Sequence, residues 1–369
     1  MNGRLVLLFA GLLLLLSYGL QMGGKLVSEG KQEVVSEASE PAASLAFPEE
    51  VHLKNVRQLT FGGDNAEAYW SFDDQMLSFQ YRNLSEGLDC DQIYWADAHG
   101  KTFAPHMISN GKGRTTCAFF LPDNKHVLYA STFATADSCL HDPDRSHGYL
   151  WGVYPSYEIY VSDLEGNIVS QLTDNNYYDA EATVSPKGDK IVFTSDRSGD
   201  LELWTMNLDG SDLKQITSDL GYDGGAFFSP DGSKIVFRAS RPSTPEAKKE
   251  YKDLLKTGYV RPNEMELFIC NADGSDLRQI THLGGANWAP FFHPSGNKII
   301  FSSNHMTKRI PFNLFMINVD GTGLEQITYD EVFDSFAMFS NDGKKIVFGS
   351  NRNNHGTRDT NLFMADWED

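Results

Sequence analysis

Lys214-Gln215-Ile216-Thr217 is one copy of a short phrase that recurs along this chain. Three more copies each close a segment rich in strand-forming residues: Ser170–Thr173, Arg278–Thr281 and Glu325–Thr328. A fifth copy, Arg57–Thr60, stands near the front of the chain with no such segment ahead of it. This repetition predicts a repeat architecture, and the displaced copy predicts that the repeats close into a ring.

The segment that ends at Thr217 shows the repeated unit most clearly. It begins at Asp179 and contains four short runs of strand-forming residues, separated by turns rich in Gly, Pro and Asp. The runs are residues 182–185, 190–194, 201–207 and 213–217. The unit shows no helical period, so we interpret it as a small four-stranded sheet.

Six such units align along the chain. The spacing of the phrase ranges from 44 residues, between Gln171 and Gln215, to 64 residues, between Gln215 and Gln279. Four strands at this period are typical of propeller blades, which stack around an axis because one small sheet cannot bury both of its faces. We therefore predict an all-β fold, a six-bladed β-propeller of four-stranded antiparallel blades.

The last unit ends soon after its third strand, residues 361–365, and has no outer strand of its own. Residues 56–60 carry the missing phrase, so we expect the N-terminal strand to join the last blade. Pairing the two ends of the domain would hide a sheet edge and lock the ring.

The chain of 369 residues has a formal net charge of −19, with 41% hydrophobic and 22% charged residues. This balance is ordinary for a globular protein, whereas the acidic surface disfavours nucleic acid and anionic lipid as partners. We expect a monomer whose partner is an envelope or extracellular protein, a peptide or a glycan. The alternative is that the negative charge serves solubility alone.

The first residues are typical of an export signal. An apolar run from Leu5 to Leu16 precedes the small residues of Ser17-Tyr18-Gly19. The run is short for a membrane span, so we predict a signal peptide over residues 1–24 and no span in the mature chain, with an uncleaved anchor as the alternative. Residues 25–50 predict a flexible linker and residues 51–369 the propeller. The predicted location is the bacterial periplasm or the outside of the cell.

Four cysteines allow three complete disulfide pairings. Cys117 and Cys139 fall in the same repeat, so we predict a disulfide between them. Cys270 lies in an apolar strand and is expected to be a buried thiol.

The units resemble the propeller repeats of TolB-like proteins. Residues 228–237, Phe-Ser-Pro-Asp-Gly-Ser-Lys-Ile-Val-Phe, fit that motif at every position, and the resemblance covers about residues 51–369. Similar repeats occur in prolyl oligopeptidase-like peptidases and oligogalacturonate lyases. Residues 25–50 are too few for the domain that precedes the propeller in TolB, and no Gly-x-Ser-x-Gly hydrolase motif is present. The resemblance implies a free-standing propeller and leaves its role open.

The innermost strands of a propeller line its channel, and aligning them on their turns gives a polar position seven residues before each turn. These residues are Asn65, Thr115, Asp179, Asp223, Asn287 and Asp334. Two residues further on, Glu67 and Glu181 face the same way. The pattern predicts a polar ring at the channel mouth that binds a cation or a polar ligand. The alternative is that the ring satisfies loop amides. No cofactor is expected, and calcium or another divalent cation is the ion that such a ring would hold.

A second set of polar residues follows the second strands on the same face. Its members are Arg197, Arg241, His305 and Arg352. They predict either salt bridges between neighbouring blades or a rim of hydrogen-bond donors for a carboxylate or a sugar.

Two insertions rise from this face, at residues 132–156 and 241–263. The first carries Tyr149, Trp151 and Tyr154, which we interpret as a recognition loop for a sugar or a peptide, or as residues that pack the loop onto its blade. The second contains a predicted short helix at residues 245–255.

These features favour an exported binding or scaffold module over an enzyme, and we assign no catalytic residue. The alternative is a metal-assisted carbohydrate-active enzyme, a lyase or a hydrolase, that acts through Glu67 or Glu181 at the channel mouth. Paired carboxyl groups can carry acid and base chemistry when their separation suits the reaction.

Overall fold

The structure is a computed structural model, and it describes residues 44–140, 144, 146 and 148–369. The predicted signal peptide and residues 25–43 of the predicted linker lie outside these residues. The compact unit runs from Ser44 to Asp369. Residues 44–50, which we expected in the linker, therefore belong to this unit, where the Glu50 carboxylate pairs with the buried Arg352.

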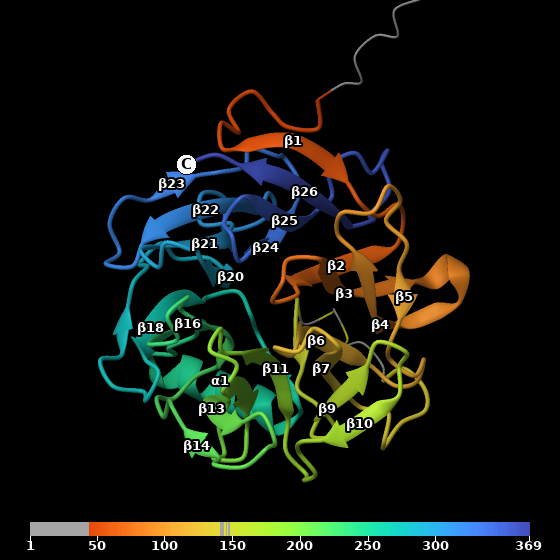
Figure 1. Ribbon diagram of the computed structural model, residues 1–369. Helices are drawn as coiled ribbons and strands as arrows, with labels where there is room; N and C mark the ends of the chain where they lie inside the picture. Colours follow the sequence, from red (N-terminus) through yellow and green to blue (C-terminus); the bar gives the residue numbers. More distant parts are fainter. Residues whose placement is uncertain (1–43, 141–143, 145, 147) are drawn as a thin grey trace, which may run out of the picture. The chain divides into compact units, whose positions relative to one another are not determined.

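Six four-stranded antiparallel sheets surround a central axis (Figure 1). Blade 1 contains β2 (Asp64–Trp70), β3 (Met76–Asn83), β4 (Leu88–Asp97) and β5 (His106–Met107), with the short 3-10 helix η1 (Leu84–Glu86) between its middle strands. Blade 2 contains β6 (Thr115–Phe120), β7 (His126–Ser131), β9 (Glu158–Asp163) and β10 (Ile168–Gln171). Blade 3 contains β11 (Asp179–Val184), β12 (Lys190–Ser195), β13 (Glu202–Asn207) and β14 (Lys214–Gln215).

The second half of the ring repeats this order. Blade 4 contains β15 (Asp223–Phe228), β16 (Lys234–Ala239), β18 (Glu266–Asn271) and β19 (Arg278–Gln279). Blade 5 contains β20 (Asn287–Phe292), β21 (Lys298–Ser303), β22 (Asn313–Asn318) and β23 (Glu325–Gln326). Blade 6 contains β24 (Asp334–Phe339), β25 (Lys345–Ser350), β26 (Asn361–Trp367) and, from the front of the chain, β1 (Leu53–Gln58). The predicted six-bladed all-β fold is confirmed.

Ring closure follows the expectation from the displaced phrase. β1 pairs antiparallel with β26, with Leu53 opposite Trp367 and Gln58 opposite Phe363. Figure 1 shows β1, in red-orange, along the outer side of β26, in dark blue. The N-terminal strand thus supplies the outer edge of the last blade.

The recurring phrase has a local physical role that is the same in all five copies. Its Gln side chain donates a hydrogen bond of 2.6–2.9 Å to the carbonyl of the Thr two residues on. Its Thr hydroxyl accepts a bond of 2.8–2.9 Å from a backbone N–H of the third strand. In the ring-closing copy, Thr60 accepts from Leu362. The phrase fastens each outer strand to its blade at a point where the sheet ladder ends.

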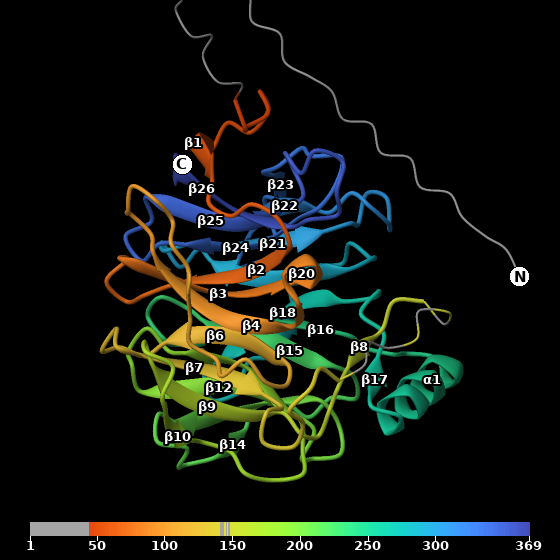
Figure 2. The same ribbon diagram turned by 90° about the vertical axis from the view of Figure 1, so that its right-hand side faces the viewer.

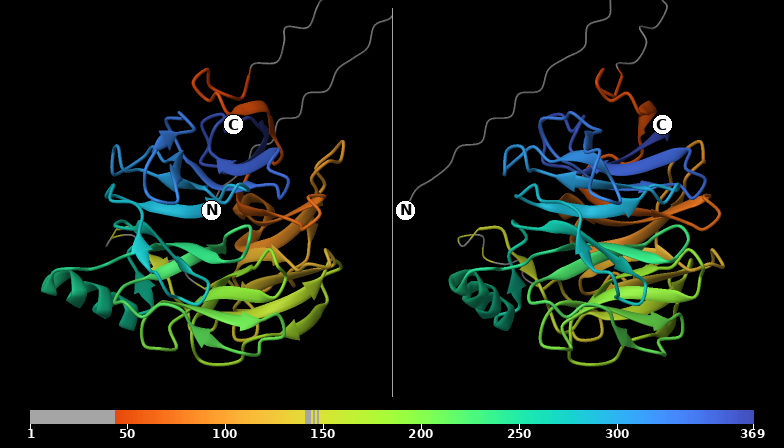
Figure 3. Two further views of the ribbon diagram at one scale, coloured as in Figure 1. Left: turned by 60° about the vertical axis from the view of Figure 1, so that its left-hand side comes forward. Right: turned by 90° about the vertical axis from the view of Figure 1, so that its left-hand side faces the viewer.

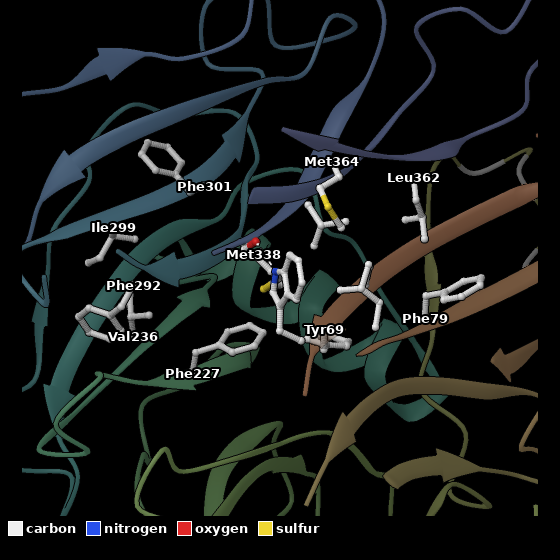
Figure 4. Close-up of a cluster of buried hydrophobic side chains, with 14 of the residues drawn as sticks. Tyr69, Phe79, Phe227, Val236, Phe292, Ile299, Phe301, Met338, Leu362 and Met364 are labelled. Carbon is white, nitrogen blue, oxygen red and sulfur yellow. Dashed lines mark hydrogen bonds between the residues drawn. The ribbon is translucent and has the colours of Figure 1, made fainter. Parts of the chain in front are cut away.

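The core lies between the blades. The second strand of every blade buries one aromatic side chain: Phe79, Tyr129, Phe193, Phe237, Phe301 and Phe348. Nearer the axis, a cluster with members in blades 1, 4, 5 and 6 includes Tyr69, Phe227 and Met338 (Figure 4). Each sheet therefore buries apolar groups on both faces only because two neighbours cover it.

The two insertions meet on one side of the ring. β8 (Trp151–Gly152) pairs antiparallel with β17 (Tyr259–Val260), which joins the insertion of blade 2 to that of blade 4. Figure 2 shows β8 and β17 beside α1 (Pro245–Lys256) on this side, and Figure 3 shows α1 projecting from the ring. Thr244 caps α1 and Pro245 begins it, which confirms the predicted helix.

The predicted Cys117–Cys139 disulfide is wrong. Cys139 bonds to Cys90, at a Cα–Cα distance of 5.4 Å, whereas Cys117 and Cys270 are buried free thiols. Cys117 lies on the innermost strand β6, so its side chain stays near the axis. Cys90 lies on β4 of blade 1, beside the loop that carries Cys139, and the disulfide therefore fastens the blade 2 insertion to its neighbour.

Among the described residues, no helix has both the length and the apolar character needed to cross a membrane.

Candidate functional site: a covered cavity at the channel mouth

The six innermost strands share a β-bulge that determines what faces the channel. In each strand the register shifts by one residue against the second strand, as between Ala180 and Thr183 in blade 3. One residue at each bulge has a left-handed backbone, with φ between 46° and 58°: Glu67, Cys117, Glu181, Gly225, Ala289 and Phe336. Such bulges re-aim a side chain and are costly for residues other than Gly. They place five side chains of four kinds, and the bare backbone of Gly225, at equivalent points around the axis.

The predicted polar ring is buried inside the blades. Asp179 and Asp223 have no exposed surface, and Arg197 and Arg241 pair with them from the same blade. Arg197 Nη2 lies 2.8 Å from both Asp179 oxygens. Arg241 reaches both Asp223 oxygens, with Nη2 at 3.0 Å from Oδ2. The innermost and second strands run antiparallel, so the start of one meets the end of the other, and these pairs form within a blade and not between blades.

In blades 5 and 6, the buried polar residue of the innermost strand is also bonded to residues near the end of the second strand. Arg352 donates a 2.9 Å hydrogen bond to the buried Asp334 and also pairs with Glu50. Asn287 accepts from Ser303 at 2.6 Å, and that hydroxyl also contacts His305 Nδ1 at 2.8 Å. Asn65 and Thr115 are buried at the equivalent positions, and Asn65 donates to the carbonyls of Gly62 and Thr360. Among all these ring and second-strand residues, Thr115 alone contributes to the cavity described next.

A cavity of about 390 Å³ lies between the bulges and the paired insertions. Glu67, Glu181, Ala289 and Phe336 line it from the innermost strands, and β8 contributes Trp151. Further lining comes from Tyr149, Tyr157, Tyr178, Tyr222, Arg238, Trp288 and Val260. The strand pair β8–β17 therefore covers the channel mouth. The volume is within the range of small-molecule sites in proteins.

Glu181 is held by a dense polar network. Arg238 forms an ion pair with it, and Tyr222 donates a 2.7 Å hydrogen bond to the same oxygen, Oε1. Thr194 and the Gly225 backbone N–H donate to Oε2 at 2.8 and 2.9 Å. The carboxylate of Glu181 raises the pKa of Arg238 despite burial, so the guanidinium stays charged.

Glu67 has a different environment. Its Oε2 accepts from the Cys117 thiol at 3.0 Å and from the Tyr69 hydroxyl at 3.2 Å. Burial raises the pKa of the Glu67 carboxyl, and the negative charge of Glu181 adds to that rise. Burial, followed by the charge of Glu67, also raises the pKa of the Cys117 thiol well above its ordinary value.

Aromatic rings form the roof of the cavity. The ring centroids of Trp151 and Trp288 are 5.3 Å apart, and Tyr149 lies 6.4–6.5 Å from both. Arg238 stacks on Trp151, with its guanidinium carbon 4.9 Å from the ring centroid. Trp151 and Tyr149, two of the three aromatic residues predicted for recognition, thus line the cavity, whereas Tyr154 lies against Tyr157 and is not part of the lining.

The sequence pattern did not predict three residues of the cavity lining: Arg238, Tyr222 and Trp288. Arg238 left a signal, because the aligned second strands place small or uncharged residues at its position: Gln80, Ala130, Thr194, Ser302 and Gly349. One Arg in such a column indicates a buried partner. Trp288 left none, because its contact with β8 depends on how the insertions pair.

Within residues 44–140, 144, 146 and 148–369, no group of three His, Cys, Asp or Glu side chains is arranged to hold a metal ion. The Asp side chains expected to hold one are paired with arginines.

The fold and the site define a six-bladed β-propeller whose channel mouth is covered by two joined insertions. A family profile described as TolB beta propeller domain matches residues 154–243. The repeats resemble those of TolB in this segment, and the chain as a whole folds as a six-bladed β-propeller. No curated relative matches it in sequence.

Solved structures share the fold at low identity. A chain described as TolB from Agrobacterium tumefaciens has 18% identity and a TM-score of 0.54, covering 83% of this chain and 91% of the other. TolB from Acinetobacter baumannii has 17% identity and a TM-score of 0.52, covering 83% of this chain and 64% of the other, so this chain spans less than two thirds of that protein. An oligogalacturonate lyase from Vibrio parahaemolyticus has 13% identity and a TM-score of 0.51, covering 84% and 79%. At these identities the likeness concerns the fold alone.

Proposed function

We propose that this protein is a non-catalytic binding module of the cell envelope that takes a polar ligand into the cavity at its channel mouth. The ligand is a small molecule, or a group presented by a peptide, a glycan or a partner protein. One observation carries the proposal: the two insertions pair over the channel and border a cavity lined by aromatic rings and ionisable side chains. Long loops on one face of a propeller are suited to this role because the rigid ring positions them.

Two features support export to the envelope. The apolar run from Leu5 to Leu16 has the composition of a signal peptide. The Cys90–Cys139 disulfide is of a kind that persists in oxidising compartments.

The state of the reactive groups favours binding over catalysis. Cys117 and Glu67 form a thiol–carboxyl pair, but the raised pKa of Cys117 keeps the thiol protonated and therefore a poor nucleophile. Glu181 is occupied by Arg238, Tyr222, Thr194 and a backbone N–H. A carboxylate held by so many donors is suited to fixing the shape of a pocket.

A second candidate function is an enzyme that uses Glu67 as an acid. The observation in its favour is that Glu67, with a raised pKa, faces Glu181, which is paired with a cation. Carboxyl groups in such contrasting environments can divide acid and base roles. Turnover of a glycan or a lactone that Glu67→Gln abolishes would establish this candidate and exclude the binding module.

The binding proposal is tested by filling the cavity. Ala289 lines the cavity and has φ of 46°. The equivalent residue of blade 6, Phe336, has φ of 57°, so this backbone conformation accommodates a phenylalanine. Ala289→Phe should therefore place a ring in the cavity. A panel of amines, sugars, organic acids and short peptides is screened for a rise in melting temperature. We expect at least one compound to stabilise the natural chain and not Ala289→Phe. Equal shifts in both proteins, or none in either, would contradict the proposal.

A further inference from the structure

The charged residues that line the cavity do not balance. They are Glu67, Asp91 and Glu181 against Arg114 and Arg238. Arg238 pairs with Glu181, and the positive charge of Arg114 opposes the rise that burial causes in the pKa of Asp91. Glu67 is the remaining carboxyl, and its two hydrogen-bond partners, Cys117 and Tyr69, are neutral. Both of these bonds reach Oε2, so neither uses Oε1.

The rest of the lining suits a cation with an apolar surface. Trp151, Trp288 and Tyr149 pack edge to face or tilted against one another at the roof. Aromatic faces attract organic cations most strongly where water is excluded. One cation of the protein itself lies on this lining. The guanidinium carbon of Arg238 is 4.9 Å from the ring centroid of Trp151 and 5.3 Å from that of Tyr222.

We infer that the ligand of this cavity is an alkylammonium ion, either a free alkylammonium compound or the lysine side chain of a peptide. The inference rests on the proposed function of the cavity as a binding site. The ammonium group would lie against the Glu67 carboxylate, and its alkyl part would contact the aromatic roof. The net charge of −19 would also raise the concentration of cations near the molecule.

Binding should be linked to a proton. The groups that face Glu67 are Tyr69 on its own strand, Cys117 on β6, Glu181 on β11 and Arg238 on β16. Burial and the charge of Glu181 favour the protonated form of Glu67, whereas a bound cation favours the ionised form. A cation that binds here therefore releases a proton, and its affinity increases as the pH rises through the raised pKa of Glu67.

The test compares charged probes with neutral molecules of the same shape by isothermal titration calorimetry. One arm uses choline against 3,3-dimethylbutan-1-ol, and the other uses the peptide acetyl-glycyl-lysyl-glycinamide against its norleucine counterpart. We expect the charged member of at least one pair to bind about tenfold to thirtyfold more tightly than its neutral partner. The arm that responds identifies the source of the ammonium group. Equal affinities within both pairs, tighter binding of the neutral members, or no binding by any probe would overturn the inference.

Two variants test whether Glu67 causes the preference for the charged probe. Glu67→Gln should weaken the binding of the charged probe about tenfold, leave the affinity of its neutral partner unchanged and abolish the dependence of affinity on pH, measured by titration in phosphate buffer. Glu165→Gln is the matched control, because Glu165 is exposed in a turn away from the cavity and should leave both probes unchanged. An unaltered charge preference in Glu67→Gln, with an unchanged melting temperature, would also overturn the inference.

The Ala289→Phe variant separates the two proposals. If neutral or anionic compounds bind the natural chain and not Ala289→Phe, the cavity is a binding site and the alkylammonium inference is wrong. If no compound depends on Ala289, both proposals fail.

Discussion

The bulge residues show how one backbone conformation presents different chemistry around the channel. All six have left-handed φ, yet their side chains range from the carboxyls of Glu67 and Glu181 to the bare Gly225. Gly225 is needed for space as well as for conformation, because a Cβ there would lie 1.6 Å from Arg238 Nη1. The absent side chain of blade 4 leaves room for the guanidinium that neutralises Glu181 in blade 3.

Gly225→Ala should therefore destabilise the protein by more than its backbone strain alone. An Ala with positive φ costs about 1 kcal/mol relative to Gly, and displacing Arg238 from Glu181 adds about 2 kcal/mol by leaving a buried charge poorly paired. Urea unfolding measures the loss. Gly87→Ala is the control, because Gly87 has φ of 77° and open space around its Cβ position. If both variants lose the same free energy, Arg238 is free to move without penalty.

At the scale of the element, the strand pair β8–β17 makes the site. Each insertion contributes one strand to it, and the Val153 N–H donates to the Gly258 carbonyl at 2.7 Å where the two insertions meet. The disulfide from Cys139 to Cys90 fastens the first insertion at its other end, near the start of the loop. The cavity roof is thus tied to blades 1, 2 and 4.

Cys139→Ser should lower the free energy of unfolding by about 2–4 kcal/mol, because the natural disulfide closes a long loop in the unfolded chain. The sequence separation of the bonded cysteines is 49 residues. Cys270→Ser is the control, since Cys270 is a free thiol, and its effect should not depend on reductant. Non-reducing peptide mapping should find the Cys90–Cys139 linkage. A peptide that joins Cys117 to Cys139 would contradict the structure.

The closing strand β1 should be the element on which the ring depends most. A chain that begins at residue 61 lacks the partner of β26, exposes that edge and loses the Thr60–Leu362 bond. We expect its melting temperature to fall by at least about 10 °C and its tendency to aggregate to rise. A chain that begins at residue 44 keeps β1 and Glu50 and serves as the control. Equal melting temperatures for the two chains would show that closure contributes little.

The blades were predictable because each repeated phrase carries its own local bonds. Gln215 and Thr217 fasten an outer strand through bonds within one short phrase, and that phrase recurs in five of the six blades. The cavity was predictable only in part. Aligning the innermost strands singles out Glu67 and Glu181, but alternation does not foresee the bulge that turns them into the cavity while the ring residues stay buried in the blades. The pairing of Trp151 with Val260 joins insertions that are far apart in the sequence and carry no shared pattern, so the roof could not be foreseen.

At the scale of the whole molecule, buried carboxyl groups should give an unusual dependence of stability on pH. Burial, together with the nearby charges of Asp223 and Asp200, raises the pKa of Glu202 to about 8, and burial raises that of Asp223 to about 6. The groups that face Glu202 are Thr217, Asp200, Asp223 and Arg241. In the unfolded chain both carboxyls ionise near pH 4, so between about pH 4 and pH 8 the folded state holds more protons and its stability falls as the pH rises.

Glu202→Gln should remove the largest part of this loss. The natural chain is expected to lose on the order of 2 kcal/mol more than Glu202→Gln between pH 5 and pH 8, because glutamine has no proton to release. Urea unfolding at pH 5, 6.5 and 8 gives the comparison. The buried His293 and the partly buried His305 have pKa values lowered by burial, and they act in the opposite direction below about pH 6.5. Their effect cancels when the two proteins are compared. Glu165→Gln should follow the natural chain, and a Glu202→Gln curve parallel to it would mean that Glu202 ionises in the folded state as it does in the unfolded chain.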